Sequence, residues 1–270
     1  MAARAGALGQ RMEWPAVARA YLASFELARA GQAEGRRASL AAHTLAARPA
    51  GLPEVDLSHL ERLTDDTGVL QHAQYSVPRY DHGYCLDDNA RALLLMASVE
   101  DAGTHERATV GALAGRYLAF VGHAFNPDTG RFRNFMSFTR AWTEECGSED
   151  SHGRAIWSLG TVLGRSQTPG TRSLAGDLFH GALPAVTGFA SPRAWAYALL
   201  GIDHYLSAFQ GDRDVEAAGS LLAERLLDLH RRTSGPDWCW FEDSLTYANA
   251  RRLQSLAAIP LKEPLSSGYK

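Results

Sequence analysis

Three pairs of adjacent acidic residues, each at or just before the expected start of a helix, are the clearest candidates for chemistry. They are Asp87-Asp88, Glu149-Asp150 and Glu242-Asp243. Two carboxyl groups flanking a glycosidic bond can supply the acid and the base or nucleophile of glycoside hydrolysis. The candidate catalytic residues are therefore Asp150, Glu149, Asp88, Asp243 and Glu242.

Asp150 is the first choice among these because of its neighbours in the sequence. Glu149 offers a second acid, His152 a titratable base and Trp142 a ring on which a sugar could stack. These residue types together fit acid–base chemistry on a saccharide.

A structural explanation of the acidic pairs competes with the catalytic one. Acidic residues at helix N-termini cap free N–H groups and interact favourably with the helix dipole. Asp88 with Arg91, and Asp150 with Arg154, also have the spacing of intrahelical salt bridges. Both explanations stay open on the sequence alone.

Aromatic and hydrogen-bonding residues accompany each acidic pair. A pyranose has polar edges and an apolar face, so carboxylates and rings at one rim favour a sugar-binding cleft. The candidate substrate-binding residues are Tyr80, His82, Tyr84, Asp87, Asn89, Arg91, Trp142, His152, Arg154, Trp240, Tyr247, Asn249 and Arg251.

A zinc site is the alternative use of the histidines and cysteines near the same helix ends. Cys85, Cys146, His152 and Cys239 could converge there, but no paired Cys-x2-Cys or His-Glu-x-x-His spacing supports this. No phosphate-binding glycine loop or Gly-x-Ser-x-Gly motif occurs either. We therefore expect no metal and no cofactor.

Composition limits the possible partners. The 270 residues carry a net charge of −3 and are 46% hydrophobic, as in an ordinary globular protein without the basic surface that nucleic acid requires. The apolar runs are too short to span a membrane, and the N-terminus lacks the apolar core of a signal peptide. The wide spacing of the three cysteines favours a reducing compartment, so we expect a cytoplasmic protein.

Hydrophobic periodicity and breaker residues predict an all-α fold of helical hairpins in series, with inner and outer helices alternating. A short helix and a turn are expected at 56–73, and one β-hairpin at 125–138, where Asn126-Pro127-Asp128-Thr129-Gly130 separates two aromatic stretches. The expected helices cover residues 13–30, 87–100, 105–121, 150–165, 171–187, 192–208, 213–232 and 246–259.

Alternate helices share a short motif. Residues 88–93 (DNARAL) are echoed at 151–156 (SHGRAI) and 247–252 (YANARR), and more loosely at 192–195 (PRAW). The small residues beside each arginine predict that the inner helices approach one another closely.

Three longer stretches, 79–94, 131–160 and 238–256, resemble a bacterial (α/α)-toroid domain of the six-hairpin glycosidase-like kind, which occurs with glycosyltransferases. This resemblance covers about 70–257. The helix at 13–30 resembles the closing helix of a GT-B glycosyltransferase. The resemblance implies carbohydrate chemistry and an oligosaccharide or polysaccharide ligand, and it suggests a glycosyltransferase domain as partner.

The chain offers about three and a half of the six hairpins of a complete toroid. We therefore expect an incomplete toroid at 55–260, preceded by a helix and linker at 1–54 and followed by an irregular tail at 261–270. The helix at 246–259 has no outer partner in the sequence, so Leu253, Leu256 and Ile259 are expected to lack cover.

Three functions follow from these observations. The leading hypothesis is a toroid that binds a glycan and could also cleave or rearrange it. The second is a non-catalytic domain that positions a glycan for a glycosyltransferase, which predicts binding without turnover. The third, a zinc-dependent toroid enzyme, requires the metal site that the spacing does not support.

Overall fold

The computed structural model describes residues 18–19, 21–26, 55–236 and 238–258, and the chain divides into two units, Met1–Val55 and Asp56–Lys270. In the first unit, residues 18–19 and 21–26 are helical, within the helix expected at 13–30. The expected linker at 31–54 and tail at 261–270 lie outside the described residues.

The second unit is mainly helical, as predicted, with a small amount of antiparallel sheet. The largest changes in helix limits concern two expected helices: α8 gives way to a 3-10 helix around Pro184, which lacks an N–H donor, and α11 begins four residues late. The helices are α4 (Ser58–Leu63), α5 (Leu86–Ala102), α6 (Arg107–Ala124), α7 (Glu149–Arg165), α8 (Pro169–Ala182), η2 (Leu183–Gly188), α9 (Pro192–Ala208), α10 (Arg213–Thr233) and α11 (Ala250–Ala258).

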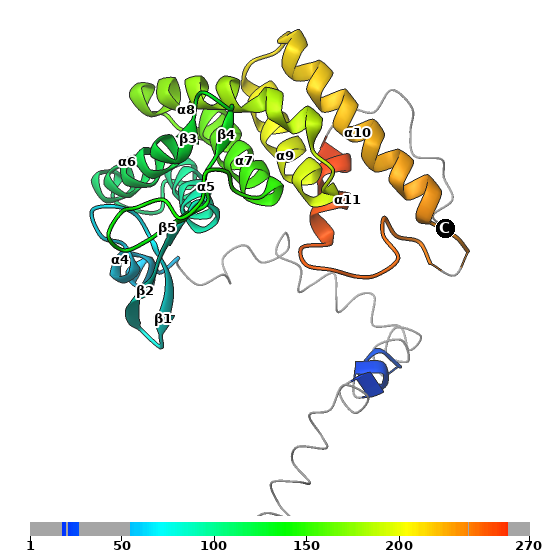
Figure 1. Cartoon of the computed structure of the whole chain (residues 1–270), viewed down its shortest axis with the longest axis horizontal. Helices are drawn as coiled ribbons and strands as arrows, with labels where there is room; N and C mark the ends of the chain where they lie inside the picture. The colour runs from blue at the N-terminus through cyan, green and yellow to red at the C-terminus, as the bar shows by residue number, and fades with distance from the viewer. Residues whose placement is uncertain (1–17, 20, 27–54, 237, 259–270) are drawn as a thin grey trace, which may run out of the picture. The chain divides into compact units, whose positions relative to one another are not determined.

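These helices form two layers, and every second helix along the chain belongs to the same layer. In the inner layer α7 packs against α5 and α9, and α9 packs against α11. In the outer layer α6, α8 and α10 cover α5, α7 and α9 respectively, each joined to its inner helix by a short connection (Figure 1). Inner and outer helices thus alternate along the chain, as the sequence predicts.

Glycines allow α7 and α9 to run parallel in close contact. A Cβ atom on Gly153 would lie 2.8 Å from the Ala194 carbonyl oxygen, and one on Gly164 would lie 2.6 Å from that of His204. The contacts advance together along both helices, so their first turns lie at the same end of the layer. The predicted close approach of the inner helices is confirmed here.

Within residues 55–236 and 238–258 the chain also forms five strands. The predicted hairpin is present as β3 (Phe125–Asn126) and β4 (Arg131–Phe132). A three-stranded antiparallel sheet, in the order β1 (Leu70–Gln74), β2 (Val77–Cys85), β5 (Phe135–Met136), was not predicted. Of the helix and turn expected at 56–73, the helix is present as α4, but residues from Leu70 onward form strand β1.

The expectation that the last inner helix lacks cover is wrong for Leu256. This side chain is 4% exposed and belongs to the same core as Phe241, which is 1% exposed. Packing of α11 against α9 provides the cover. The side chains of Leu253 and Ile259 lie outside the described residues.

Candidate functional site

The first turns of α5 and α7, together with the loop before α11 and the start of α11, carry most of the predicted site residues. The acidic pairs open α5 and α7, and the third pair lies in the loop that leads to α11. Because α7 and α9 run parallel, contacts at this end join residues far apart in the sequence.

Arg154 is the centre of these contacts. Its side chain is only 7% exposed; Nε lies 3.0 Å from Asp87 Oδ1, and Nη1 donates to Asp87 Oδ2 at 3.0 Å. Nη2 donates to the Tyr197 hydroxyl at 2.9 Å, and Cζ lies 4.7 Å from the Tyr197 ring centroid. Burial lowers the pKa of Arg154, but Asp87 and the tyrosines outweigh it, so the pKa is raised. Arg154 thus links α5, α7 and α9 as a permanent cation.

Two further rings and a second arginine extend this centre toward solvent. The Tyr247 ring, 60% exposed, lies 5.3 Å from Arg154 Cζ. Trp157 stacks on Tyr197 with ring centroids 5.9 Å apart, and Arg251 Cζ lies 4.7 Å from the Trp157 ring. We call these five residues, Arg154, Trp157, Tyr197, Tyr247 and Arg251, the arginine–aromatic face.

Glu149 and Asp150 hold the start of α9. Glu149 Oε2 accepts hydrogen bonds from the backbone amides of Ala190 at 2.9 Å and Ser191 at 2.7 Å. Asp150 accepts from the Ser191 hydroxyl at 2.6 Å and from Arg193 Nε at 2.8 Å. Both carboxylates are thus committed to joining two helices.

The two residues of the third acidic pair have different surroundings: Glu242 is bonded to other side chains, and Asp243 is exposed. Glu242 accepts from Arg252 at 2.6 Å and from the Thr246 hydroxyl at 3.1 Å, and the Arg252 side chain is fully buried. Arg252 Nη1 also donates to Asn249 Oδ1 at 3.0 Å, so Asn249 holds the loop. Asp243 is exposed and has no hydrogen bond or ion pair to any other described residue.

Asp88 is bonded within its own helix start. Its Oδ2 accepts from the Cys85 thiol at 3.1 Å, and its amide donates to Cys85 Sγ, which caps α5. Burial, assisted by Asp88, raises the pKa of the Cys85 thiol well above its ordinary value. Arg91 pairs with Asp87 and lies 3.7 Å from Asp88.

The predicted binding residues Asn89 of α5 and His152 of α7 are fully buried. Asn89 accepts from the Val69 amide at 3.0 Å and donates to the Cys85 carbonyl at 2.9 Å. His152 Nε2 donates to the Ala182 carbonyl at 3.0 Å between Phe132 and Phe189, and burial lowers the His152 pKa to about 3. The titratable base that was expected beside Asp150 is thus a neutral core residue.

The predicted residues on the sheet do not contact the arginine–aromatic face. Tyr84 is buried and donates to Asp65 at 2.5 Å; burial and this bond raise its pKa to about 12. Tyr80 is 54% exposed and stacks on Phe138, with centroids 4.5 Å apart. His82 is exposed beside Asp81.

The two remaining predicted rings pack within the unit. Trp142 lies against Phe120, with centroids 5.7 Å apart, and against His123 at 5.3 Å. Trp240 meets Phe241 edge to face at 5.5 Å. Both indoles are partly buried and belong to the periphery of the core.

The described part of the chain contains no set of side chains that could bind zinc. No group of three or more His, Cys, Asp or Glu side chains there has the geometry to hold a metal ion. Cys85 is buried against Asp88, whereas Cys146 is exposed and its thiol bonds to the Gly147 carbonyl.

Trp157, Tyr197 and Arg252 are not among the site residues predicted from the sequence. Arg252 belongs to the repeated motif at 247–252, next to the arginine that was chosen. Trp157 follows Arg154 by three residues and so shares its helix face. Tyr197 had no such signal, because its role depends on the pairing of α7 with α9.

No family model, no curated protein and no solved structure matches this chain. No helix within the described ranges is long and apolar enough to cross a membrane. The resemblance to a six-hairpin glycosidase-like toroid therefore stays a prediction.

Proposed function

We propose that the helical unit is a saccharide-binding domain whose binding surface is the arginine–aromatic face. The observation that carries this proposal is the exposed Tyr247 ring over Arg154. Aromatic rings offer apolar surface to a pyranose face, and guanidinium groups donate hydrogen bonds to hydroxyl oxygens. The neighbouring pair of Arg251 over Trp157 repeats the combination within the same face.

The carboxylates support binding rather than hydrolysis. Asp87, Glu149, Asp150 and Glu242 each bond to an arginine or to backbone amides, and these bonds hold the helix starts together. A general acid or base must be able to exchange a proton with the substrate. Asp243 has the least restrained carboxylate, and no described base or second acid contacts it.

The wider proposal is a partial (α/α) toroid that positions a glycan for a glycosyltransferase. The alternating layers and the shared end of α7 and α9 support the toroid arrangement. An oligosaccharide or polysaccharide is the proposed ligand. The cytoplasm is the proposed compartment, in agreement with the free thiols of Cys85 and Cys146.

Isothermal titration with a panel of neutral gluco-, manno- and xylo-oligosaccharides tests the proposal. Tyr247→Ala removes an exposed ring, so the fold is retained while the Kd of the best ligand rises at least about tenfold, equivalent to about 1.4 kcal/mol. Tyr75→Ala is the matched control, because Tyr75 is 94% exposed on the β1–β2 turn and its loss leaves the Kd unchanged.

Two results would contradict the proposal: no oligosaccharide binds, or both tyrosine variants bind as the parent does. Release of reducing ends, measured in the same samples, separates binding from hydrolysis. We expect no release of reducing ends. Turnover that is abolished by Asp243→Asn would instead favour a glycoside hydrolase.

A further inference from the structure

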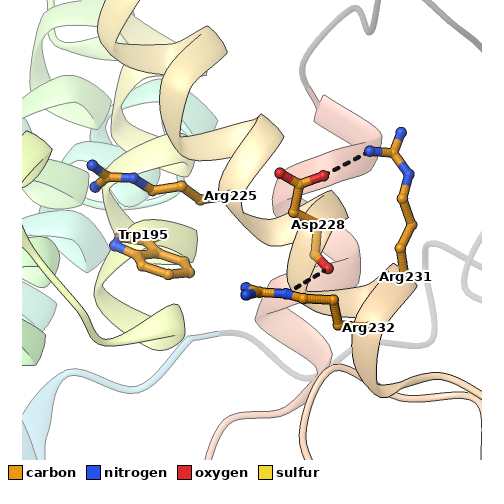
Figure 2. Close-up of a pocket in the computed structure, with 5 residues that line it drawn as sticks. All are labelled: Trp195, Arg225, Asp228, Arg231 and Arg232. Atoms are coloured by element: carbon orange, nitrogen blue, oxygen red, sulfur yellow. Dashed lines mark hydrogen bonds and ion pairs between the residues drawn. The ribbon is translucent and has the colours of Figure 1, made fainter.

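A pocket lies between the start of α9 and the end of α10. It has a volume of about 390 Å³ and is lined by Trp195 from the first turn of α9 and by Arg225, Asp228, Arg231 and Arg232 from the last part of α10 (Figure 2). Because α10 follows α9 through a tight turn and packs back on it, the end of α10 meets the start of α9. We call it the α9–α10 pocket.

Positive charge dominates this pocket. Three arginines and one aspartate give it a net charge of +2. Asp228 is already paired with Arg231 at 2.8 Å, and its backbone carbonyl accepts from Arg232 Nε at 3.3 Å. Arg225 and Arg232 have no carboxylate partner among the described residues, whereas Arg154, Arg193 and Arg252 are all paired.

Trp195 supplies a fixed apolar wall. Its Nε1 donates to the Phe189 carbonyl at 2.8 Å, which sets the orientation of the half-buried ring. Arg225 Cζ lies 5.8 Å from this ring. Figure 2 shows the Arg225 and Arg232 side chains on the same side of α10 as Trp195, while Arg231 points toward the other side.

We propose that the α9–α10 pocket binds an anionic saccharide group, a phosphate ester or a carboxylate carried on a sugar ring. Guanidinium groups match the geometry of phosphate and carboxylate oxygens, and the indole offers the apolar face for the ring. The volume is within the range of small-molecule sites. The anionic part of this inference rests on the pocket itself, and the saccharide part rests on the proposed function.

Titration calorimetry of the full chain with four probes tests the inference: inorganic pyrophosphate, glucose 6-phosphate, glucuronate and glucose. A charged sugar should bind at least tenfold tighter than glucose, and raised salt should weaken it. Stronger binding of glucose 6-phosphate assigns a phosphate ester, and stronger binding of glucuronate assigns a carboxylate.

The variants Arg232→Gln and Arg225→Gln should each weaken the charged sugar at least tenfold. Arg232 is exposed, so its substitution leaves the fold intact. Arg213→Gln is the matched control, since Arg213 is an exposed arginine at the opposite end of α10. Its affinity should stay within twofold of the parent.

Equal affinity for glucose and both charged sugars, or full affinity in both pocket variants, would overturn the inference. Binding of pyrophosphate without either charged sugar would overturn the saccharide class. Failure of the proposed function is a separate result, because it is measured with neutral oligosaccharides and Tyr247→Ala. Tyr247 is not part of this pocket.

Discussion

Gly160 of α7 and Gly201 of α9 face each other so closely that a Cβ atom on Gly160 would lie 2.0 Å from the Gly201 carbonyl oxygen. Gly201 is equally close to α7, because a Cβ atom on Gly201 would lie 2.3 Å from the Ile156 carbonyl oxygen. Backbone cannot yield as a side chain can, so this contact fixes the distance between the two inner helices.

Gly160→Ala should therefore destabilise the fold by about 3 kcal/mol, at the upper end of overpacking costs, as measured by denaturant unfolding. Gly115→Ala in α6 is the matched control: nothing lies within 4 Å of its added Cβ, so it should stabilise by about 0.5–1 kcal/mol. Equal stability of the two variants would contradict the close helix contact.

Asp87→Asn tests the link between α5 and α7. Removing one charge leaves the buried Arg154 without its partner, which costs about 3–5 kcal/mol for a buried pair; because Asp87 is 23% exposed, we expect about 3 kcal/mol. The control is Asp66→Asn, whose partner Arg140 lies at 2.6 Å with both side chains exposed, and it should change stability little. A similar effect of both variants on the unfolding midpoint would refute the special role of Asp87.

His152 should make stability depend on pH. Its folded pKa of about 3 lies below the unfolded value near 6.5, so below pH 6.5 the unfolded state binds more protons and stability falls. The slope approaches about 1.36 kcal/mol per pH unit below pH 6.5, and the loss at pH 5 relative to alkaline pH is about 2 kcal/mol.

His152→Gln keeps a donor for the Ala182 carbonyl and removes the titrating ring. Free energies of unfolding measured from pH 7.5 to 5 should fall less steeply for the variant than for the parent. His204, whose pKa is also lowered by burial, is common to both proteins and cancels. Parallel curves would show that His152 is not held neutral in the core.

Asp150→Asn separates a structural carboxylate from a reactive one. Asp150 accepts hydrogen bonds from Ser191 and Arg193, and the side chains of Asp150 and Arg193 are 27% and 30% exposed. We therefore expect a loss of about 1 kcal/mol in unfolding free energy. Asp243→Asn, on an exposed residue, should melt like the parent. Unchanged melting of Asp150→Asn together with loss of saccharide binding would return Asp150 to the candidate site.

The helices could be predicted because their signals are local. Breakers such as Pro169-Gly170 and Gly211-Asp212 separate the periodic stretches, and the limits of α7, α9 and α10 agree within a residue. The sheet could not be predicted in the same way. Its β1–β2 turn carries Tyr75 at a φ of 57° in place of the usual glycine or asparagine, and the outer half of β2 is exposed on both faces, without alternation.

The candidate site was predictable only in part. The acidic pairs do stand at helix starts, but the choice of partner depends on tertiary packing: Asp87 and Arg154 are 67 positions apart. His152 shows the opposite failure. Its place near Asp150 in the sequence suggested a shared surface, yet two helical positions turn the side chain by about 200°, from the helix end into the core.

Amide hydrogen exchange with and without the tightest oligosaccharide of the panel tests the central claim most directly. We expect slower exchange at 242–249, the loop that carries Tyr247, and unchanged exchange in the β1–β2 hairpin. Protection confined to the hairpin, or exchange at 242–249 that the bound saccharide leaves unaltered, would contradict a binding surface at the arginine–aromatic face.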